Sequence, residues 1–246
     1  MQRYGQLRRE LPASVQLLAV SKGQPADAVR LLYELGQRSF GESRLQEAQE
    51  KQALLADLVD IDWHFIGRLQ TNKVRPVLAR FSCLHSVDSL ELAKRISRIA
   101  LEEGHSPKLY AQVQLRLDPN KGGFQLDQLR QQWPQLQELP GVAWVGVMLI
   151  PPQDLGTDEL AQIFKQGASL AAELQLPGSS MGMSNDWPLA VAAGSTLVRL
   201  IPNSMKGGII IGAGIAALMG EISAGGRLAN TPISLVLGSL ICLYLM

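Results

Sequence analysis

The segment Leu17-Leu18-Ala19-Val20-Ser21-Lys22-Gly23 places a lysine directly after a short apolar run. The run from Val15 to Val20 has the length and composition of a buried strand, and Gly23 marks the turn after it. A lysine at the mouth of a sheet or barrel can be partly desolvated, and desolvation suits an amine to capture an aldehyde as a Schiff base. A solvated lysine at the start of a loop is the simpler interpretation of this segment alone.

Strand-like and helix-like segments alternate through the first 200 residues. The predicted strands are 15–21, 39–42, 63–67, 83–87, 109–117, 142–150, 179–184 and 196–200. The predicted helices are 25–35, 44–58, 72–79, 88–101, 126–139, 158–173 and 188–193, and Pro134 is expected to break or kink the fifth of them. Strands rich in Val, Ile and Leu with helices between them are typical of a parallel sheet covered by helices.

This alternation predicts an α/β fold, a single (β/α)8 TIM-like barrel. About 200 residues is the low end of the size range of such barrels. A doubly wound open sheet is the alternative, but no glycine fingerprint for a dinucleotide follows the first strand.

Bulk composition excludes some classes of protein. The chain has 246 residues, a net charge of +1 and 18% charged residues, which gives no electrostatic footprint for nucleic acid. Its two cysteines, Cys83 and Cys242, match no redox motif and supply no disulfide framework, which suits the reducing cytoplasm. The polar, arginine-rich start Met1 to Glu10 does not resemble a signal peptide.

The last 46 residues differ from the rest. Between Ile201 and Met246 the charged side chains are Lys206, Glu221 and Arg227. The apolar runs there are shorter than the ~18 to 20 residues of a spanning helix. We therefore predict a barrel at 1–200 and, at 201–246, an apolar tail of foreign appearance that is a candidate for membrane contact.

Polar residues gather where the predicted strands end, which in a barrel is the active face. They are Lys22, Ser43, Arg68, Arg116, Ser184-Asn185-Asp186 and Arg199. The Ser184 segment is predicted to begin a helix, whose first N–H groups can bind a phosphate. Arg199 is equally consistent with a structural pair to a carboxylate. An amine for the aldehyde, donors for the phosphate and a partner for the ring nitrogen together indicate a pyridoxal-phosphate site.

His64, within Trp63-His64-Phe65-Ile66-Gly67, is interpreted as a packed core histidine. Because no further ligand was recognised at metal spacing beside it, the sequence predicts no metal site.

Several longer motifs resemble one known family. They are Ala19-Val20-Ser21-Lys22, Phe40-Gly41-Glu42-Ser43-Arg44-Leu45-Gln46-Glu47, Trp63-His64-Phe65-Ile66-Gly67-Arg68-Leu69-Gln70-Thr71-Asn72-Lys73, Ser184-Asn185-Asp186 and Ala193-Gly194-Ser195-Thr196-Leu197-Val198-Arg199. Together they resemble the pyridoxal-phosphate-binding proteins of the YggS/PROSC type, most of all the cyanobacterial members. The resemblance covers about 11–200, and the third motif is the most specific.

The resemblance implies a barrel like the N-terminal domain of alanine racemase. It implies that Lys22 holds pyridoxal 5'-phosphate as an aldimine, that Arg199 faces the ring nitrogen and that Ser184 with its following amides holds the phosphate, with Ser43 nearby. It further implies a role without strong catalysis, in cofactor homeostasis and in amino-acid and keto-acid balance, with pyridoxal-phosphate-dependent apoenzymes as partners. We expect a monomer. No catalytic residue is expected.

Two positions depart from the family. It usually has Asn where this chain has Ser43, and Gly with a small polar residue where this chain has Ile201-Pro202 after Arg199-Leu200. Proline has no N–H to donate, and glycine lets the backbone approach an anion closely. Two alternatives stay open. One is a racemase or lyase of low activity that uses the same aldimine, and the other is a membrane-associated fusion protein whose barrel is a passenger for the tail.

Overall fold

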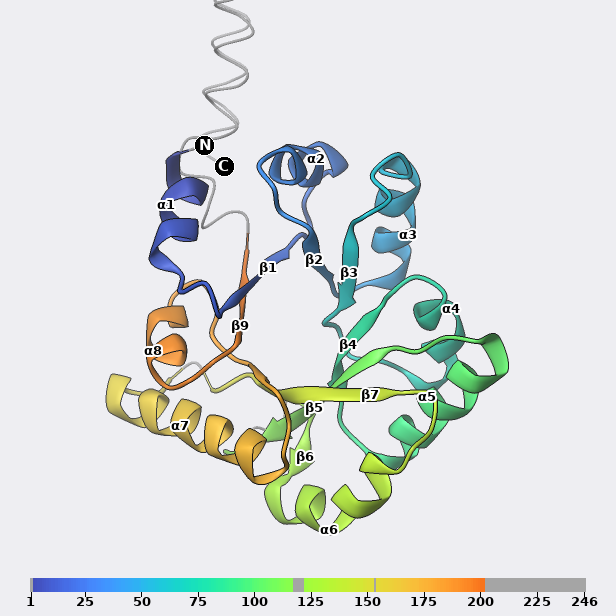
Figure 1. The fold of residues 1–246 in the computed structure, drawn as a ribbon, viewed down its shortest axis with the longest axis vertical. Helices are drawn as coiled ribbons and strands as arrows, with labels where there is room; N and C mark the ends of the chain where they lie inside the picture. The colour runs from blue at the N-terminus through green and yellow to red at the C-terminus, as the bar shows by residue number, and fades with distance from the viewer. Residues whose placement is uncertain (1, 117–121, 153, 202–246) are drawn as a thin grey trace, which may run out of the picture.

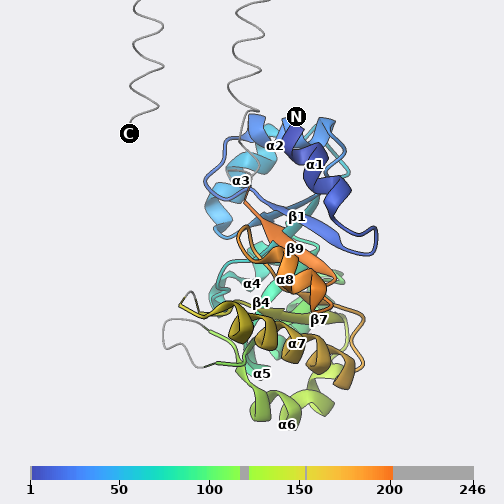
Figure 2. The ribbon, with the colours of Figure 1, turned by 90° about the vertical axis from the view of Figure 1, so that its left-hand side faces the viewer.

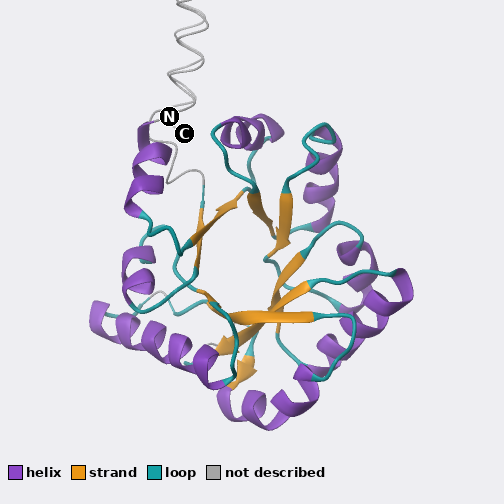
Figure 3. Ribbon diagram, in the orientation of Figure 1, coloured by secondary structure: helices purple, strands orange, loops and turns teal. Residues whose placement is uncertain are grey.

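The structure, a computed structural model, describes residues 2–116, 122–152 and 154–201. Eight of the described strands close into a parallel barrel, and helices surround it (Figure 1, Figure 3). In barrel order the strands are β1 Gln16–Val20, β2 Ser39–Glu42, β3 Asp62–Phe65, β4 Cys83–Val87, β5 Lys108–Gln114, β7 Ala143–Leu149, β8 Ser179–Ser180 and β9 Leu197–Leu200. A two-residue strand, β6 Phe124–Gln125, pairs with the end of β5.

Closure of the barrel rests on the pairing of its first and last strands. Leu17 lies opposite Val198 and Leu18 opposite Arg199 in parallel register. An open doubly wound sheet would leave β1 and β9 apart, so the predicted barrel is confirmed and the alternative is wrong.

The helices form the outer layer (Figure 2). They are α1 Gln2–Glu10, α2 Ala26–Glu34, α3 Leu45–Leu54, the 3-10 turn η1 Thr71–Lys73, α4 Val74–Leu78, α5 Leu90–Glu103, α6 Leu126–Gln137, α7 Thr157–Glu173 and α8 Trp187–Ala192. Local signals explain their ends. Ser89 caps α5 by accepting from the Leu92 N–H at 3.3 Å, and Gly104 ends this helix with φ 69°.

Three elements differ from the sequence prediction. Helix α1, which was not predicted, packs Tyr4 and Leu7 beside α2. Helix α6 continues through Pro134, because Pro134 is exposed while Trp133 and Leu136 anchor the inner face of the helix. The strand predicted at 179–184 ends at Ser180, because Gly182 takes φ 91° and turns the chain.

Alternation along the strands creates two apolar layers. Leu17 and Ala19 point outward and pack with α1 and α2, whereas Leu18 points into the barrel. The apolar interior consists of Leu18, Cys83, Tyr110, Met148 and Leu197, with Ile66, Val145 and Ile150 packed against them. Polar side chains share this interior and are described below.

Among the helices of the described ranges, none has the length and apolar character needed to cross a bilayer. Apart from Ile201, the tail predicted at 201–246 lies outside the described residues.

Candidate functional site

Lys22 lies at the carboxyl end of the barrel, two residues beyond the end of β1. The Ser21 N–H donates to the Gly41 carbonyl at 3.0 Å, and the Gly23 N–H donates to Oε1 of Glu47, so both neighbours of Lys22 are fixed. The Lys22 side chain is exposed, and the partial burial that we expected of it is not seen. The predicted position at the rim is nevertheless the observed one.

A buried ion pair holds the barrel wall beneath the Lys22 loop. Glu42 on β2 is fully buried, and its Oε1 lies 2.5 Å from Nζ of Lys51 on α3. Lys51 also donates to the Ser21 carbonyl at 2.7 Å and to Glu47 at 3.2 Å, and the Ser21 hydroxyl donates to Glu42 at 2.6 Å. Burial raises the pKa of Glu42 despite these partners. The sequence pattern predicts only part of this cluster, because Glu47 and Lys51 lie four residues apart on one helix, whereas Glu42 joins them from β2 in the folded barrel.

Ser43 follows β2 and is half-buried at the same rim. A Cβ atom at Gly67 would lie 2.0 Å from the Ser43 carbonyl oxygen, so the loop after β3 can pack here only with glycine. The Ser86 hydroxyl donates to the Gly67 carbonyl at 2.5 Å and fixes the loop from the other side. This contact explains the glycine of the most specific motif.

A surface cavity of about 860 Å³ opens beside Ser43. Its lining includes Arg44, Glu47, Arg68 and Lys73. Because Glu47 also holds Gly23, this cavity adjoins the loop that carries Lys22.

Arg199 is buried at the carboxyl end of β9, next to β1 in the barrel. Its Nη1 donates to the Ser180 carbonyl at 2.6 Å and to the Ser180 hydroxyl at 2.7 Å, and its Nη2 donates to the Leu149 carbonyl at 2.7 Å. Burial lowers the pKa of Arg199 to about 10, which leaves the guanidinium charged at neutral pH. These three hydrogen bonds go to neutral acceptors, whereas the nearby carboxylate of Asp186 acts on Arg199 through its charge and raises the pKa of the guanidinium.

Ser184 is half-buried in the turn between β8 and α8, as predicted. A Cβ atom at Gly182 would lie 2.7 Å from the Ala190 Cβ, and the Gly182 carbonyl accepts from the Arg199 N–H at 3.0 Å. The turn is therefore tied to the strand that carries Arg199. The Ser184 hydroxyl accepts from the Ile201 N–H at 3.3 Å, so the position that departs from the family contacts the predicted phosphate site.

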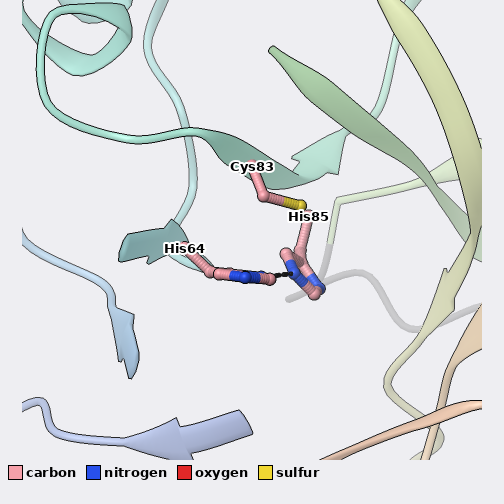
Figure 4. Close-up of side chains that lie close together, drawn as sticks. All are labelled: His64, Cys83 and His85. Atoms are coloured by element: carbon pink, nitrogen blue, oxygen red, sulfur yellow. Dashed lines mark hydrogen bonds between the residues drawn. The ribbon is translucent and has the colours of Figure 1, made fainter. Parts of the chain in front are cut away.

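The barrel interior brings together three further side chains that the sequence analysis did not connect. His64 from β3 and Cys83 and His85 from β4 are buried, and one ligand atom of each lies within 4.8 Å of the others (Figure 4). His64 Nδ1 and His85 Nε2 are hydrogen-bonded to each other at 2.9 Å. The interpretation of His64 as a packed, bonded core histidine is confirmed, whereas the absence of a metal site stays a prediction. Only the register of β3 on β4, which pairs His64 with Cys83, reveals the cluster.

Comparisons with known proteins agree with this geometry. The family model of the alanine racemase N-terminal domain matches residues 1–200. A pyridoxal phosphate homeostasis protein of Synechocystis sp. is 41% identical over 203 residues, covering 80% of this chain and 93% of the relative. One from Escherichia coli K12 is 35% identical over 196 residues, covering 77% and 84%.

Solved structures show the same barrel. PipY of Synechococcus elongatus PCC7942, solved with PLP bound, is 49% identical with a TM-score of 0.78, covering 81% of this chain and 96% of that chain. An alanine racemase of Clostridium difficile 630 is 18% identical with a TM-score of 0.63, covering 80% and 53%, and shares the fold alone.

Proposed function

The chain belongs to the alanine racemase N-terminal domain family, and within it to the pyridoxal phosphate homeostasis proteins, and from this premise we propose that it binds pyridoxal 5'-phosphate to maintain the intracellular supply of that cofactor. The support from relatives is the printed function of the curated proteins and the PipY structure with PLP bound. The observation that carries the proposal is Arg199, a buried cation held at the carboxyl rim beside the strand that leads to Lys22.

The described residues fit this cofactor. When bound, pyridoxal phosphate supplies an aldehyde that an amine captures reversibly. We assign the amine to Lys22, which is exposed at the rim and therefore reachable by a ligand from solution. Arg199 would hold the ring nitrogen, Ser184 would hold the phosphate, and Ser43, directly after β2, would supply a further hydroxyl.

Arg199 also favours a role without strong catalysis. A charged guanidinium next to the ring nitrogen disfavours protonation of that nitrogen, because like charges repel. An unprotonated ring withdraws electrons less strongly, which weakens the chemistry on which transaminases rely. We therefore propose a carrier that hands its cofactor to pyridoxal-phosphate-dependent apoenzymes in the cytoplasm, as a monomer.

The decisive experiment is borohydride reduction of the protein incubated with pyridoxal phosphate, followed by peptide mapping. We expect one stable modification at Lys22, its loss in Lys22→Ala, and unchanged labelling in Lys94→Ala, which removes an exposed lysine of α5 away from the rim. A colourless protein that stays unlabelled would contradict cofactor binding. Rapid interconversion or elimination of an amino acid by the loaded protein would favour the racemase or lyase alternative instead.

We further propose that 201–246 is an apolar segment separate from the cofactor-binding barrel and that it contacts membranes. Cutting the chain after Ile201 keeps the Ile201 N–H that contacts Ser184. We expect the shortened chain to bind pyridoxal phosphate and to leave the membrane fraction. Equal recovery of both chains from the membrane-free fraction would contradict the role of the tail without affecting the barrel.

A further inference from the structure

A continuous line of polar side chains crosses the barrel interior from one end to the other. Its members are Asp62 at the start of β3, His64, His85, Ser180 and Arg199 near the end of β9. Asp62 Oδ2 lies 3.0 Å from His64 Nε2, and the two histidines are bonded at 2.9 Å. His85 Nδ1 lies 3.0 Å from the Ser180 hydroxyl, which is 2.7 Å from Arg199 Nη1. The proposed cofactor contacts only the Arg199 end.

Only one direction of donation satisfies every member of this line. A guanidinium can only donate, so the Ser180 hydroxyl oxygen accepts from Arg199. The Ser180 hydroxyl hydrogen then needs an acceptor, and among the described residues its other bonded partner is His85 Nδ1. A buried hydroxyl without an acceptor would be costly, which excludes a proton on that nitrogen.

The same reasoning fixes the two histidine rings. With Nδ1 as the acceptor, a neutral His85 carries its proton on Nε2 and donates to Nδ1 of His64. His64 in turn carries its proton on Nε2 and donates to the carboxylate of Asp62. The hydrogen bonds therefore all run from Arg199 to Asp62, and each ring is the neutral Nε2–H tautomer.

Charge and burial agree with this assignment. Burial, the largest cause, together with the charge of Arg199 lowers the pKa of His85 well below its ordinary value, so this ring is neutral. The hydrogen bond from His64 lowers the pKa of Asp62 to about 2, so Asp62 is ionised at neutral pH. Tyr110 stacks on the His85 ring at 4.4 Å between centroids and holds its plane.

We propose that this one-way hydrogen-bond chain, with Asp62 as its last acceptor, makes His85 and Ser180 positioning residues that aim the Arg199 guanidinium at the cofactor. Asp186 is the carboxylate whose charge acts on Arg199. Three of the five guanidinium N–H groups are used by the bonds to Ser180 and Leu149. The hydrogen-bond chain thereby sets which side of the guanidinium is left to face the barrel mouth. This inference rests on the proposed function, because it assigns the Arg199 end to the cofactor.

The polarity of the chain can be tested without any cofactor. Nitrogen-15 NMR of the ligand-free protein should show His85 as the neutral Nε2–H tautomer, unchanged between pH 5 and pH 8. It should also show Nδ1 of His64 as the acceptor, without a proton. A proton on Nδ1 of His85, or titration of its ring in this range, would overturn the inference. So would a stoichiometric metal ion held by His64, Cys83 and His85, because it would replace the proton between the two rings.

The link to the cofactor is tested by binding and absorption of pyridoxal phosphate. His85→Phe keeps an aromatic ring on Tyr110 but removes the acceptor of Ser180, and Ser180→Ala removes the hydroxyl itself. We expect about tenfold weaker binding in each, the upper range for one lost hydrogen bond in the chain that holds Arg199, with a shifted absorption maximum of the bound cofactor. Asp60→Asn, which removes an exposed carboxylate near Asp62, should change neither.

Wild-type binding and spectra in both variants would overturn the positioning role while leaving the proposed function intact. Failure of the unaltered protein to bind pyridoxal phosphate would instead contradict the proposed function. The histidine tautomers would still show the direction of the hydrogen-bond chain. If a variant fails to fold, the NMR measurement on the unaltered protein decides the polarity of the chain.

Discussion

Two buried cations flank the proposed site, and they are held in opposite ways. On the Lys22 side, Lys51 lies outside the barrel wall in direct contact with the buried carboxylate of Glu42, 2.5 Å away. On the other side, Arg199 lies inside the barrel on carbonyl and hydroxyl oxygens, with the carboxylate of Asp62 four hydrogen bonds away. The ion pair with Glu42 neutralises Lys51, which therefore stabilises the fold. The hydrogen bonds of Arg199 go to neutral acceptors, and they leave its charge available to a ligand.

The largest effect should come from breaking the direct pair. Lys51→Met would leave Glu42 as a buried carboxylate without its cation, and we expect the free energy of unfolding to fall by about 3 to 5 kcal/mol. Chemical denaturation at pH 7 measures this loss. The double variant with Glu42→Gln should recover most of it, because no unpaired charge remains. Lys94→Met is the control on an exposed helix face, and a similar loss there would contradict the explanation.

The Lys51→Met loss should also depend on pH in a defined direction. Burial raises the pKa of Glu42 above its ordinary value of 4.5, and the hydrogen bond and charge of Lys51 oppose that rise. Without Lys51 the folded-state pKa rises further, so stability is retained below pH 4.5 and is lost as the pH rises through the new pKa. The variant should therefore be closer to wild type at pH 5 than at pH 8, and the reverse order would contradict a buried, ionised Glu42.

Removing Arg199 should lower the free energy of unfolding by less than removing Lys51, and this loss should not depend on pH. Arg199→Met leaves the Ser180 and Leu149 carbonyls without their charged donor, and we expect a loss of about 2 to 4 kcal/mol. Since the pKa of Arg199 is about 10, the residue is charged throughout pH 5 to 8 and the loss should be flat across that range. A loss that varied with pH as in Lys51→Met would show that Arg199 is paired directly after all.

Asp62, at the far end of the hydrogen-bond chain, should contribute less to the free energy of unfolding than either cation. Asp62 has its pKa lowered from 3.8 to about 2, chiefly by the hydrogen bond from His64. A depressed carboxyl pKa contributes stability above pH 4 that is lost as the pH falls through about 2. Because the Asp62 side chain is 35% exposed, we expect Asp62→Asn to remove only about 1 kcal/mol at pH 7, and nothing below pH 2. The free energies of unfolding of the wild type and of Asp62→Asn should therefore become equal at this pH. A constant difference between them down to pH 2 would show that the charge of Asp62 is not the cause of the loss.

The rim residues and the contacts that hold them also differ in how much of each the sequence predicts. The positions of Lys22, Ser43, Ser184 and Arg199 at one rim follow from the alternation of strands and helices, because parallel strands place their carboxyl ends together. The bracing contacts do not follow from it. His85 meets Ser180 only after the barrel closes across 95 residues of sequence, and no local period encodes that distance. The continuation of α6 through Pro134 does not follow from it either, because it depends on the burial of Trp133 and Leu136 on the inner face of the helix.

The smallest effect should come from Ser43, which contacts neither buried cation in the hydrogen bonds described above. The family's usual Asn at this position has a longer side chain with both a donor and an acceptor, so Ser43→Asn should tighten binding of pyridoxal phosphate by about threefold, within the range of one added neutral hydrogen bond. Stability should not change, because Ser43 is half-buried at the open rim. Equilibrium titration of the absorption band measures the affinity, and Ser43→Ala is the matched control that should weaken it by a similar factor. If Asn and Ala weaken binding equally, the rim at β2 is shaped for serine in this chain, and the family's usual residue does not transfer to it.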